Sequence, residues 1–193
     1  WVGRLQPEKG ITYLLDALAL IKRQDFNALN NVEVHLIGSG ELESELKEKS
    51  NMFGLNEIVK FCGRMYGVEL IKEYKSSHLF VLPSLYEGQP LTLLEAWAAK
   101  LPLIVTDVGG NKDFVVEGEN GYMVPAKDAN ALAQSLLNVI SPENHQKIAL
   151  MGEKGYQLVK KSYSWEKMVE KTSKVYHLLI NNKNPNQMRN TIR

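Results

Sequence analysis

Two glutamates flank the start of a predicted helix in residues 84–99, SLYEGQPLTLLEAWAA. Glu87 precedes the helix, Glu95 lies inside it, and Pro90 suits the first helical position because its fixed φ is already helical. The unpaired N–H groups of such a helix end attract an anion such as phosphate. Carboxylates repel phosphate, so we expect the glutamates to accept hydrogen bonds from hydroxyl groups attached to it. Phosphate and hydroxyl groups together describe a nucleotide sugar.

The same stretch has a plainer interpretation as a capped surface helix with two solvated glutamates. For an isolated pair of glutamates this interpretation is favoured, and only the rest of the chain overturns it. Apolar residues recur at helical spacing in the stretch, namely Leu91, Leu94, Trp97 and Ala98. The spacing predicts that this face packs inward and that Glu95 stays exposed.

Length and composition narrow the class of protein. The chain has 193 residues, of which 44% are hydrophobic, and suits one well-cored domain. A net charge of +1 without a long basic run gives no electrostatic case for nucleic acid as a partner. The single cysteine, Cys62, excludes an internal disulfide and a cysteine-cluster metal site, and we interpret it as a core residue. No apolar stretch approaches the roughly 20 residues that span a bilayer.

Short apolar segments alternate with amphipathic ones along the chain. Strands are expected at 1–5, 32–37, 58–62, 79–82, 103–106 and 122–124, with helices between and after them, including one capped by Asp128. The alternation predicts an α/β fold with a doubly wound, Rossmann-like parallel sheet. The domain is expected to span 1–180, with its first strand truncated because the chain opens without methionine, and the polar residues 181–193 to form a frayed tail.

Ligands bind beyond the carboxyl ends of the strands in such sheets. The loops expected there are 4–10, 38–40, 63–65, 84–91 and 107–111. Arg4 and Lys9 lie in the first loop, where both can reach a common diphosphate, although such residues near a strand end are more often solvated. Arg64 and Met65 follow another strand, where the guanidinium plane can stack on a nucleobase.

Other motifs are weaker. Gly38-Ser39-Gly40 lacks the third glycine of a dinucleotide fingerprint and follows the second strand. We favour a tight turn in which Ser39 caps the next helix, with close approach of a ligand to the backbone as the alternative. The four histidines lack metal-type spacing and receive no role. Ser39 and Ser84 lack a GxSxG context, which disfavours a serine hydrolase.

Three stretches in order resemble one family: VGRLQPEKG, PSLYEGQPLTLLEAWAAKLPLIVTDVGGN and EGENGYMVPAKDANALAQSL. They resemble the carboxyl-terminal, donor-binding domain of GT-B glycosyltransferases, specifically family 4 (glycosyl transferases group 1). The closing YSWEKMVEKTSKVYHLL resembles the end of that domain. The resemblance covers residues 1 to about 180 and so places several separate motifs in the family's order.

The resemblance implies retaining transfer of a hexose-type sugar from a nucleoside diphosphate sugar, UDP-linked rather than GDP-linked, to an acceptor. It implies that Arg4 and Lys9 hold the diphosphate, that Glu87 lies at the donor sugar, and that Glu95 accepts hydrogen bonds from the ribose hydroxyls. Other donor-binding residues that it implies are Gly3, Gly38, Arg64, Met65, Gly88, Gln89, Pro90, Leu91 and Thr92. Of these, Arg64 and Met65 match the positions that contact the base.

The resemblance also implies that no metal is required, since Arg4 and Lys9 serve the diphosphate. The acceptor site is implied to lie on a missing amino-terminal domain, so this chain alone is expected to be inactive. The pathway implied is surface polysaccharide or lipopolysaccharide biosynthesis, in the cytoplasm or at the inner face of the cell membrane through the missing half. Gln89 and Trp97 depart from the family's usual apolar residues, which bears on sugar choice.

Several alternatives remain open. A nucleotide-sugar epimerase, a sugar phosphorylase and a non-catalytic nucleotide-sugar-binding module share the architecture. An oxidoreductase that binds a dinucleotide at residues 38–40 is disfavoured, because no complete fingerprint precedes a suitable acidic residue. For Glu87, orientation of the sugar and offset of developing positive charge are favoured over a covalent nucleophile.

Overall fold

The structure, a computed structural model, describes residues 1–181. Contacts divide the chain into two compact units, residues 1–156 and residues 157–193, and each is described by itself. The division falls within a long helix, α6 (His145–Ser162). The predicted domain end at residue 180 lies inside the second unit, and the predicted tail lies outside the described residues beyond residue 181.

The first unit contains two parallel sheets. In one, β1 (Val34–Ile37) pairs with β2 (Val59–Gly63). In the other, β4 (Leu103–Thr106) lies between β3 (Phe80–Leu82) and β5 (Tyr122–Val124), with Ile104 opposite both Val81 and Tyr122. All four residues of β4 are buried, as expected for a central strand covered on both faces. The predicted α/β, Rossmann-like architecture is confirmed.

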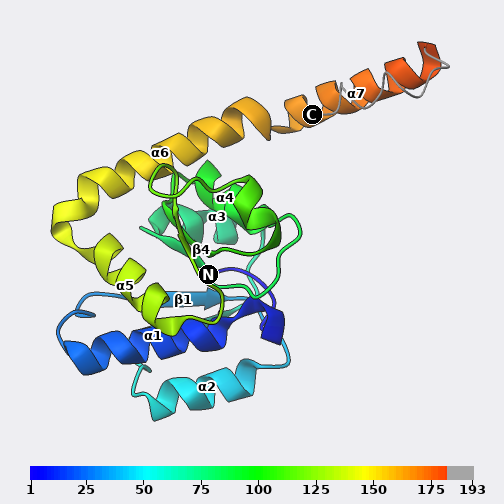
Figure 1. The fold of residues 1–193 in the computed structure, drawn as a ribbon. Coiled ribbons are helices and arrows are strands. Elements are labelled where there is room, and N and C mark those ends of the chain that lie inside the picture. Colours follow the sequence, from blue (N-terminus) through cyan, green and yellow to red (C-terminus); the bar gives the residue numbers. More distant parts are fainter. Residues whose placement is uncertain (182–193) are drawn as a thin grey trace. The chain divides into compact units, whose positions relative to one another are not determined.

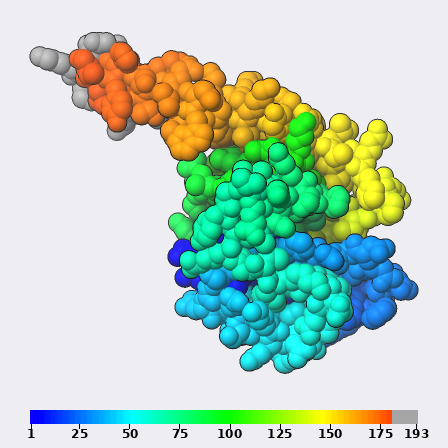
Figure 2. Space-filling model, turned by 180° about the vertical axis from the view of Figure 1, so that it is seen from behind, coloured from blue at the N-terminus to red at the C-terminus, as the bar shows by residue number. Residues whose placement is uncertain are grey.

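Helices connect these strands (Figure 1). They are η1 (Pro7–Lys9), α1 (Ile11–Gln24), α2 (Glu43–Met52), α3 (Gly67–Ser76), α4 (Leu91–Ala98), η2 (Gly109–Asp113), α5 (Ala129–Ile140) and η3 (Pro142–Asn144). Helices α1 and α5 pack side by side, and the face shown in Figure 2 carries α2 in cyan and α3 in turquoise. The predicted cap of α5 is confirmed, because Oδ1 of Asp128 accepts a hydrogen bond from the Ala131 N–H at 2.9 Å.

The predicted strand at 1–5 is replaced by a single parallel bridge between Val2 and Ile37. The Gly3 N–H donates to the Ile37 carbonyl at 3.0 Å, so the segment does run beside β1. The ladder ends there because the chain turns at once, and the Gln6 N–H donates to the Arg4 carbonyl at 2.9 Å. The turn places the following loop at the carboxyl end of β1.

Helix α4 buries a different face from the one predicted. Leu93, Ala96 and Trp97 are fully buried, whereas Leu91 is 65% exposed. Ala98 is also exposed, and Leu94 is half-buried. The helix carries apolar residues on most of its circumference, so their spacing does not select a face, and the packing of α4 against β3 and β4 does. Glu95 is exposed, as predicted.

The described part of the second unit is helical. It comprises the end of α6 and helix α7 (Trp165–Asn181). Several apolar side chains of α7 are exposed, including Trp165 at 76% and Ile180 at 80%. Within residues 1–181, no helix combines the length and the apolar character needed to cross a membrane.

Candidate functional site

The five loops predicted at the carboxyl ends of the strands lie together in the first unit. Backbone hydrogen bonds join them in a row: Gly38 N–H to Gly63 O at 2.6 Å, Leu5 N–H to Ser39 O at 3.0 Å, Leu85 N–H to Glu8 O at 2.7 Å, and Gly110 N–H to Glu87 O at 3.0 Å. Parallel strands bring their carboxyl ends to the same edge of a sheet. The convergence of these loops is therefore confirmed.

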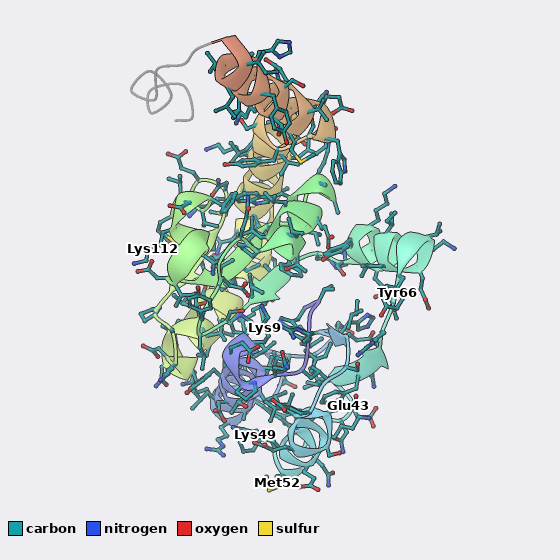
Figure 3. The ribbon with its side chains drawn as sticks, turned by 90° about the vertical axis from the view of Figure 1, so that its right-hand side faces the viewer. Lys9, Glu43, Lys49, Met52, Tyr66 and Lys112 are labelled. Carbon is teal, nitrogen blue, oxygen red and sulfur yellow. The ribbon has the colours of Figure 1, made fainter. Side chains whose placement is uncertain are left out.

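Glu87 is the buried carboxylate of this loop cluster, with an exposure of only 7%. Lys9 Nζ donates to Glu87 Oε1 at 2.7 Å, and Ser84 Oγ donates to the same oxygen at 2.6 Å. Lys9 lies immediately before the N-terminal end of α1 (Figure 3). A buried carboxylate is tolerated when it is paired and hydrogen-bonded, and Glu87 has both kinds of partner.

The loop after β4 supports the loop that carries Glu87. Thr106 Oγ1 donates to the Ser84 carbonyl, and Asn111 Nδ2 donates to the Thr106 carbonyl at 2.9 Å. Gly109 has φ +43°, and a Cβ on it would lie 2.0 Å from the Glu87 carbonyl oxygen. Only glycine fits this approach, so the sequence GG after β4 fixes the distance between the two loops.

Glu95 has a partner that the sequence did not predict. Tyr74 on α3 donates its hydroxyl to Glu95 Oε2 at 2.9 Å, although Tyr74 itself is only 6% exposed. Burial, together with the adjacent carboxylate, raises the pKa of Tyr74 above its usual range, so the phenol stays a donor at neutral pH. A single tyrosine in an amphipathic helix gives no sequence signal for a contact with a residue 21 positions away.

The segment between Glu87 and α4 faces solvent. Gly88, Gln89 and Leu91 are exposed, and a Cβ on Gly88 would meet no atom within 4 Å. Thr92 is half-buried. Pro90 is buried at the N-cap, one position before the predicted one, and no side chain caps the helix. The exposed backbone here leaves room for a ligand against the start of α4.

The remaining predicted residues lie at the edge of the loop cluster. The Arg4 side chain is 72% exposed, with its guanidinium 4.0 Å from Glu8 Oε1. Arg64 is exposed, and its Nε donates to Ser39 Oγ at 2.6 Å. The prediction that Ser39 caps α2 is wrong, since that helix has no side-chain cap and Ser39 binds Arg64 across two loops. Met65 is half-buried beside Arg64.

Two glycines of the first loops pack against each other. Gly38 has φ +140°, and a Cβ on it would lie 1.7 Å from the Gly3 carbonyl oxygen. The close backbone approach at Gly38 is therefore made to the chain's own 1–5 segment. This contact explains the glycine without a dinucleotide.

Trp97 is part of the core. It is fully buried, and its Nε1–H donates to the Asn120 carbonyl at 3.0 Å. A Cβ on Gly155 of α6 would lie 2.0 Å from Trp97 Cδ1, so the indole occupies space that only a glycine leaves free. The departure of Trp97 from the family pattern is thus explained by packing.

Metal ligands are not clustered in the described chain. Residues 1–181 hold no group of three or more His, Cys, Asp or Glu side chains arranged to bind a metal ion. His35 pairs instead with Glu73 at 2.8 Å, and Cys62 is a half-buried free thiol.

The fold and the converging loops define a GT-B glycosyltransferase domain. Residues 1–158 match the family described as glycosyl transferases group 1, and the chain belongs to that family.

Relatives of known name agree with this family. An uncharacterized glycosyltransferase of Methanocaldococcus jannaschii is 32% identical over 180 residues, which are 93% of this chain and 44% of that protein. The UDP-Gal:alpha-D-GlcNAc-diphosphoundecaprenol alpha-1,3-galactosyltransferase of Escherichia coli is 30% identical over 191 residues, covering 94% of this chain and 46% of that protein. The chain thus spans less than half the length of these two relatives.

A solved structure gives the same result. TarM of Staphylococcus aureus, crystallised in complex with fondaparinux, alpha-GlcNAc-glycerol and UDP, superposes with a TM-score of 0.78 and 27% identity. The match covers 94% of this chain and 34% of TarM.

Proposed function

We propose that this chain is the donor-binding half of a retaining family 4 glycosyltransferase, which transfers a hexose-type sugar from a UDP-sugar to an acceptor. The contact between Lys9 and Glu87 carries the proposal, since it joins a cation suited to diphosphate and a carboxylate suited to a sugar in one ion pair of 2.7 Å. TarM, similar over 94% of this chain, was crystallised with UDP, and the E. coli relative is named for UDP-Gal. Both names support a uridine donor.

The diphosphate would lie against the start of α4, between Lys9 and Arg4. The free N–H groups and the helix dipole favour an anion there. When the sugar–phosphate bond breaks, the bonding electrons stay on the diphosphate oxygen, and the two cations stabilise the charge that develops. Because two side-chain cations serve this role, we propose that donor binding requires no metal ion.

Glu87 would act on the sugar. As the sugar–phosphate bond lengthens, positive charge develops on the anomeric carbon and ring oxygen, and a nearby carboxylate offsets it. Lys9 and Ser84 hold Glu87 through Oε1, which fixes the orientation of the carboxyl group. The acceptor hydroxyl then attacks from the face that the diphosphate leaves, which retains the configuration.

The nucleoside would extend along the same loop cluster. Glu95 accepts hydrogen bonds from the ribose hydroxyls, and Gly88, Gln89 and Thr92 contact the sugar and phosphates through the backbone before and at the start of α4. The exposed guanidinium of Arg64 stacks on the base, with Met65 beside it. Gly3 and Gly38 lie under this surface and shape the adjoining loops.

The acceptor and the pathway extend the proposal beyond this chain. The acceptor site would lie on another domain of the same enzyme, since the chain spans less than half of its relatives. The E. coli relative is named for an acceptor linked to diphosphoundecaprenol, which supports surface polysaccharide or lipopolysaccharide synthesis. Assembly on a lipid-linked acceptor suits the inner face of the cell membrane.

Calorimetric titration with UDP, GDP, ADP and their hexose conjugates, with and without chelator, tests the donor proposal. We expect UDP and a UDP-hexose to bind equally well in chelator, and Glu95→Ala to weaken UDP binding by about ten-fold through the lost ribose hydrogen bonds. The control is Glu48→Ala, which removes an exposed glutamate from α2. A folded chain that binds none of the nucleotides contradicts the donor proposal, and a requirement for metal contradicts its metal independence.

A further inference from the structure

Tyr74 joins a rigid, buried ring to an exposed carboxylate. Its ring packs against Phe80 of β3, with the ring centroids 5.8 Å apart and the planes at 43°. Its hydroxyl donates to Glu95 Oε2 at 2.9 Å across the gap between α3 and α4. The preceding residue, Glu73, contacts His35 Nδ1 of β1 at 2.8 Å, so this turn of α3 is also fixed to the first sheet.

This bond restricts a side chain that is otherwise free to rotate. Glu95 is exposed on α4, and an exposed glutamate loses considerable rotamer entropy when a ligand immobilises it. The Tyr74 hydroxyl occupies one acceptor position on Oε2 and leaves the other oxygen available. A carboxylate held in this way can accept bonds from two neighbouring hydroxyl groups without first being ordered.

We propose that Tyr74 is a positioning residue for the nucleotide, which orients the Glu95 carboxylate toward the two vicinal hydroxyls of the ribose. The proposal rests on the ribose-binding role proposed for Glu95. It adds that part of the affinity for a ribonucleotide comes from a residue on α3 that need not touch the ligand.

The proposal predicts an effect that depends on the ribose hydroxyls. Tyr74→Phe removes the hydroxyl and keeps the ring, so the packing on Phe80 stays, and the exposed Glu95 carboxylate can turn to water. We therefore expect the variant to fold. Because the hydroxyl acts only through Glu95, its loss should weaken UDP binding and leave the binding of 2′,3′-dideoxy-UDP unchanged.

Calorimetry on the full chain measures both affinities for the wild type, Tyr74→Phe, Glu95→Ala and the double variant. We expect Tyr74→Phe to weaken UDP binding by about five-fold, as for a lost hydrogen bond to a charged group, and to have no further effect in the Glu95→Ala background. The matched control is Tyr122→Phe, since Tyr122 is 9% exposed and its hydroxyl has no hydrogen-bond partner within the described residues. This control should bind both ligands as the wild type does.

Each outcome bears on a separate claim. Equal loss of affinity for UDP and dideoxy-UDP in Tyr74→Phe, or no loss for either, overturns the positioning role while leaving the ribose role of Glu95 intact. A wild type that binds the two ligands equally well and is insensitive to Glu95→Ala overturns the ribose role, and the positioning role with it. A folded chain that binds neither ligand overturns the donor proposal as well.

Discussion

Glu87 shows how one carboxyl group is prepared by its neighbours. Both hydrogen bonds, from Lys9 and from Ser84, reach Oε1. Lys9 is itself only 20% exposed, so the pair is shielded from the solvent that weakens surface ion pairs. Replacement of either partner would leave the other in a costly environment, because a buried charge without its partner is strongly destabilising.

Glu87→Gln tests the role of this charge. Glutamine keeps the shape and an oxygen that can accept from Lys9 and Ser84, but it removes the negative charge that would offset an oxocarbenium-like state. We expect turnover to fall by about 100-fold and nucleotide affinity to change by less than about two-fold. Sugar transfer would be measured in an active, full-length protein that contains this chain, alongside UDP titration. Unchanged turnover would remove Glu87 from the mechanism.

At the scale of elements, the loops at the carboxyl ends of the strands support one another. Gly109 and Gly110 of η2 approach the backbone at residues 87 and 88, and a Cβ on Gly110 would lie 1.7 Å from the Gly88 carbonyl oxygen. The position of the loop that precedes α4 therefore depends on the loop that follows β4. A change in η2 is transmitted to Glu87 through backbone contact.

Gly110→Ala tests this dependence. The added Cβ must push the 87–90 loop away, so we expect a loss of about 1–3 kcal/mol in unfolding free energy and weaker UDP binding. The matched control for stability is Gly88→Ala on the opposing strand of chain, since a Cβ there meets no atom within 4 Å. Denaturant unfolding gives the first quantity and calorimetry the second. Equal stability of the two variants would show that the loops are not held apart by this contact.

At the scale of the whole molecule, this chain carries one side of the proposed reaction. Its loops supply residues suited to a nucleotide sugar, and its two relatives are more than twice as long. A donor held at these loops would still need an acceptor placed within bonding distance of the anomeric carbon. That placement is the part of the proposal that this chain does not provide by itself.

We accordingly expect the 193-residue chain to bind a UDP-hexose without transferring the sugar. Incubation with radiolabelled UDP-hexose and a lipid-linked acceptor should give no labelled product, while the same preparation binds UDP in calorimetry. Product analysis also separates the alternatives, because an epimerase would interconvert the bound sugar and a phosphorylase would consume phosphate. Transfer by the chain alone would contradict the assignment of the acceptor site to another domain.

The sequence by itself determined the parallel α/β class, the position of most strands and helices, and the cap at Asp128. It also placed Glu87 before and Glu95 inside one helix. These features depend on periodicity, turn residues and capping, which act over a few neighbouring residues. The family motifs are local in the same sense, which is why they were recognisable without a structure.

Only the tertiary structure decided which residues meet. Lys9 and Glu87 are 78 positions apart, and Tyr74 reaches Glu95 from another helix. The buried face of α4 was predicted wrongly because an almost wholly apolar helix can pack in several orientations, and its neighbours select one. Such contacts result from packing all elements at once, so neither spacing nor composition contains them.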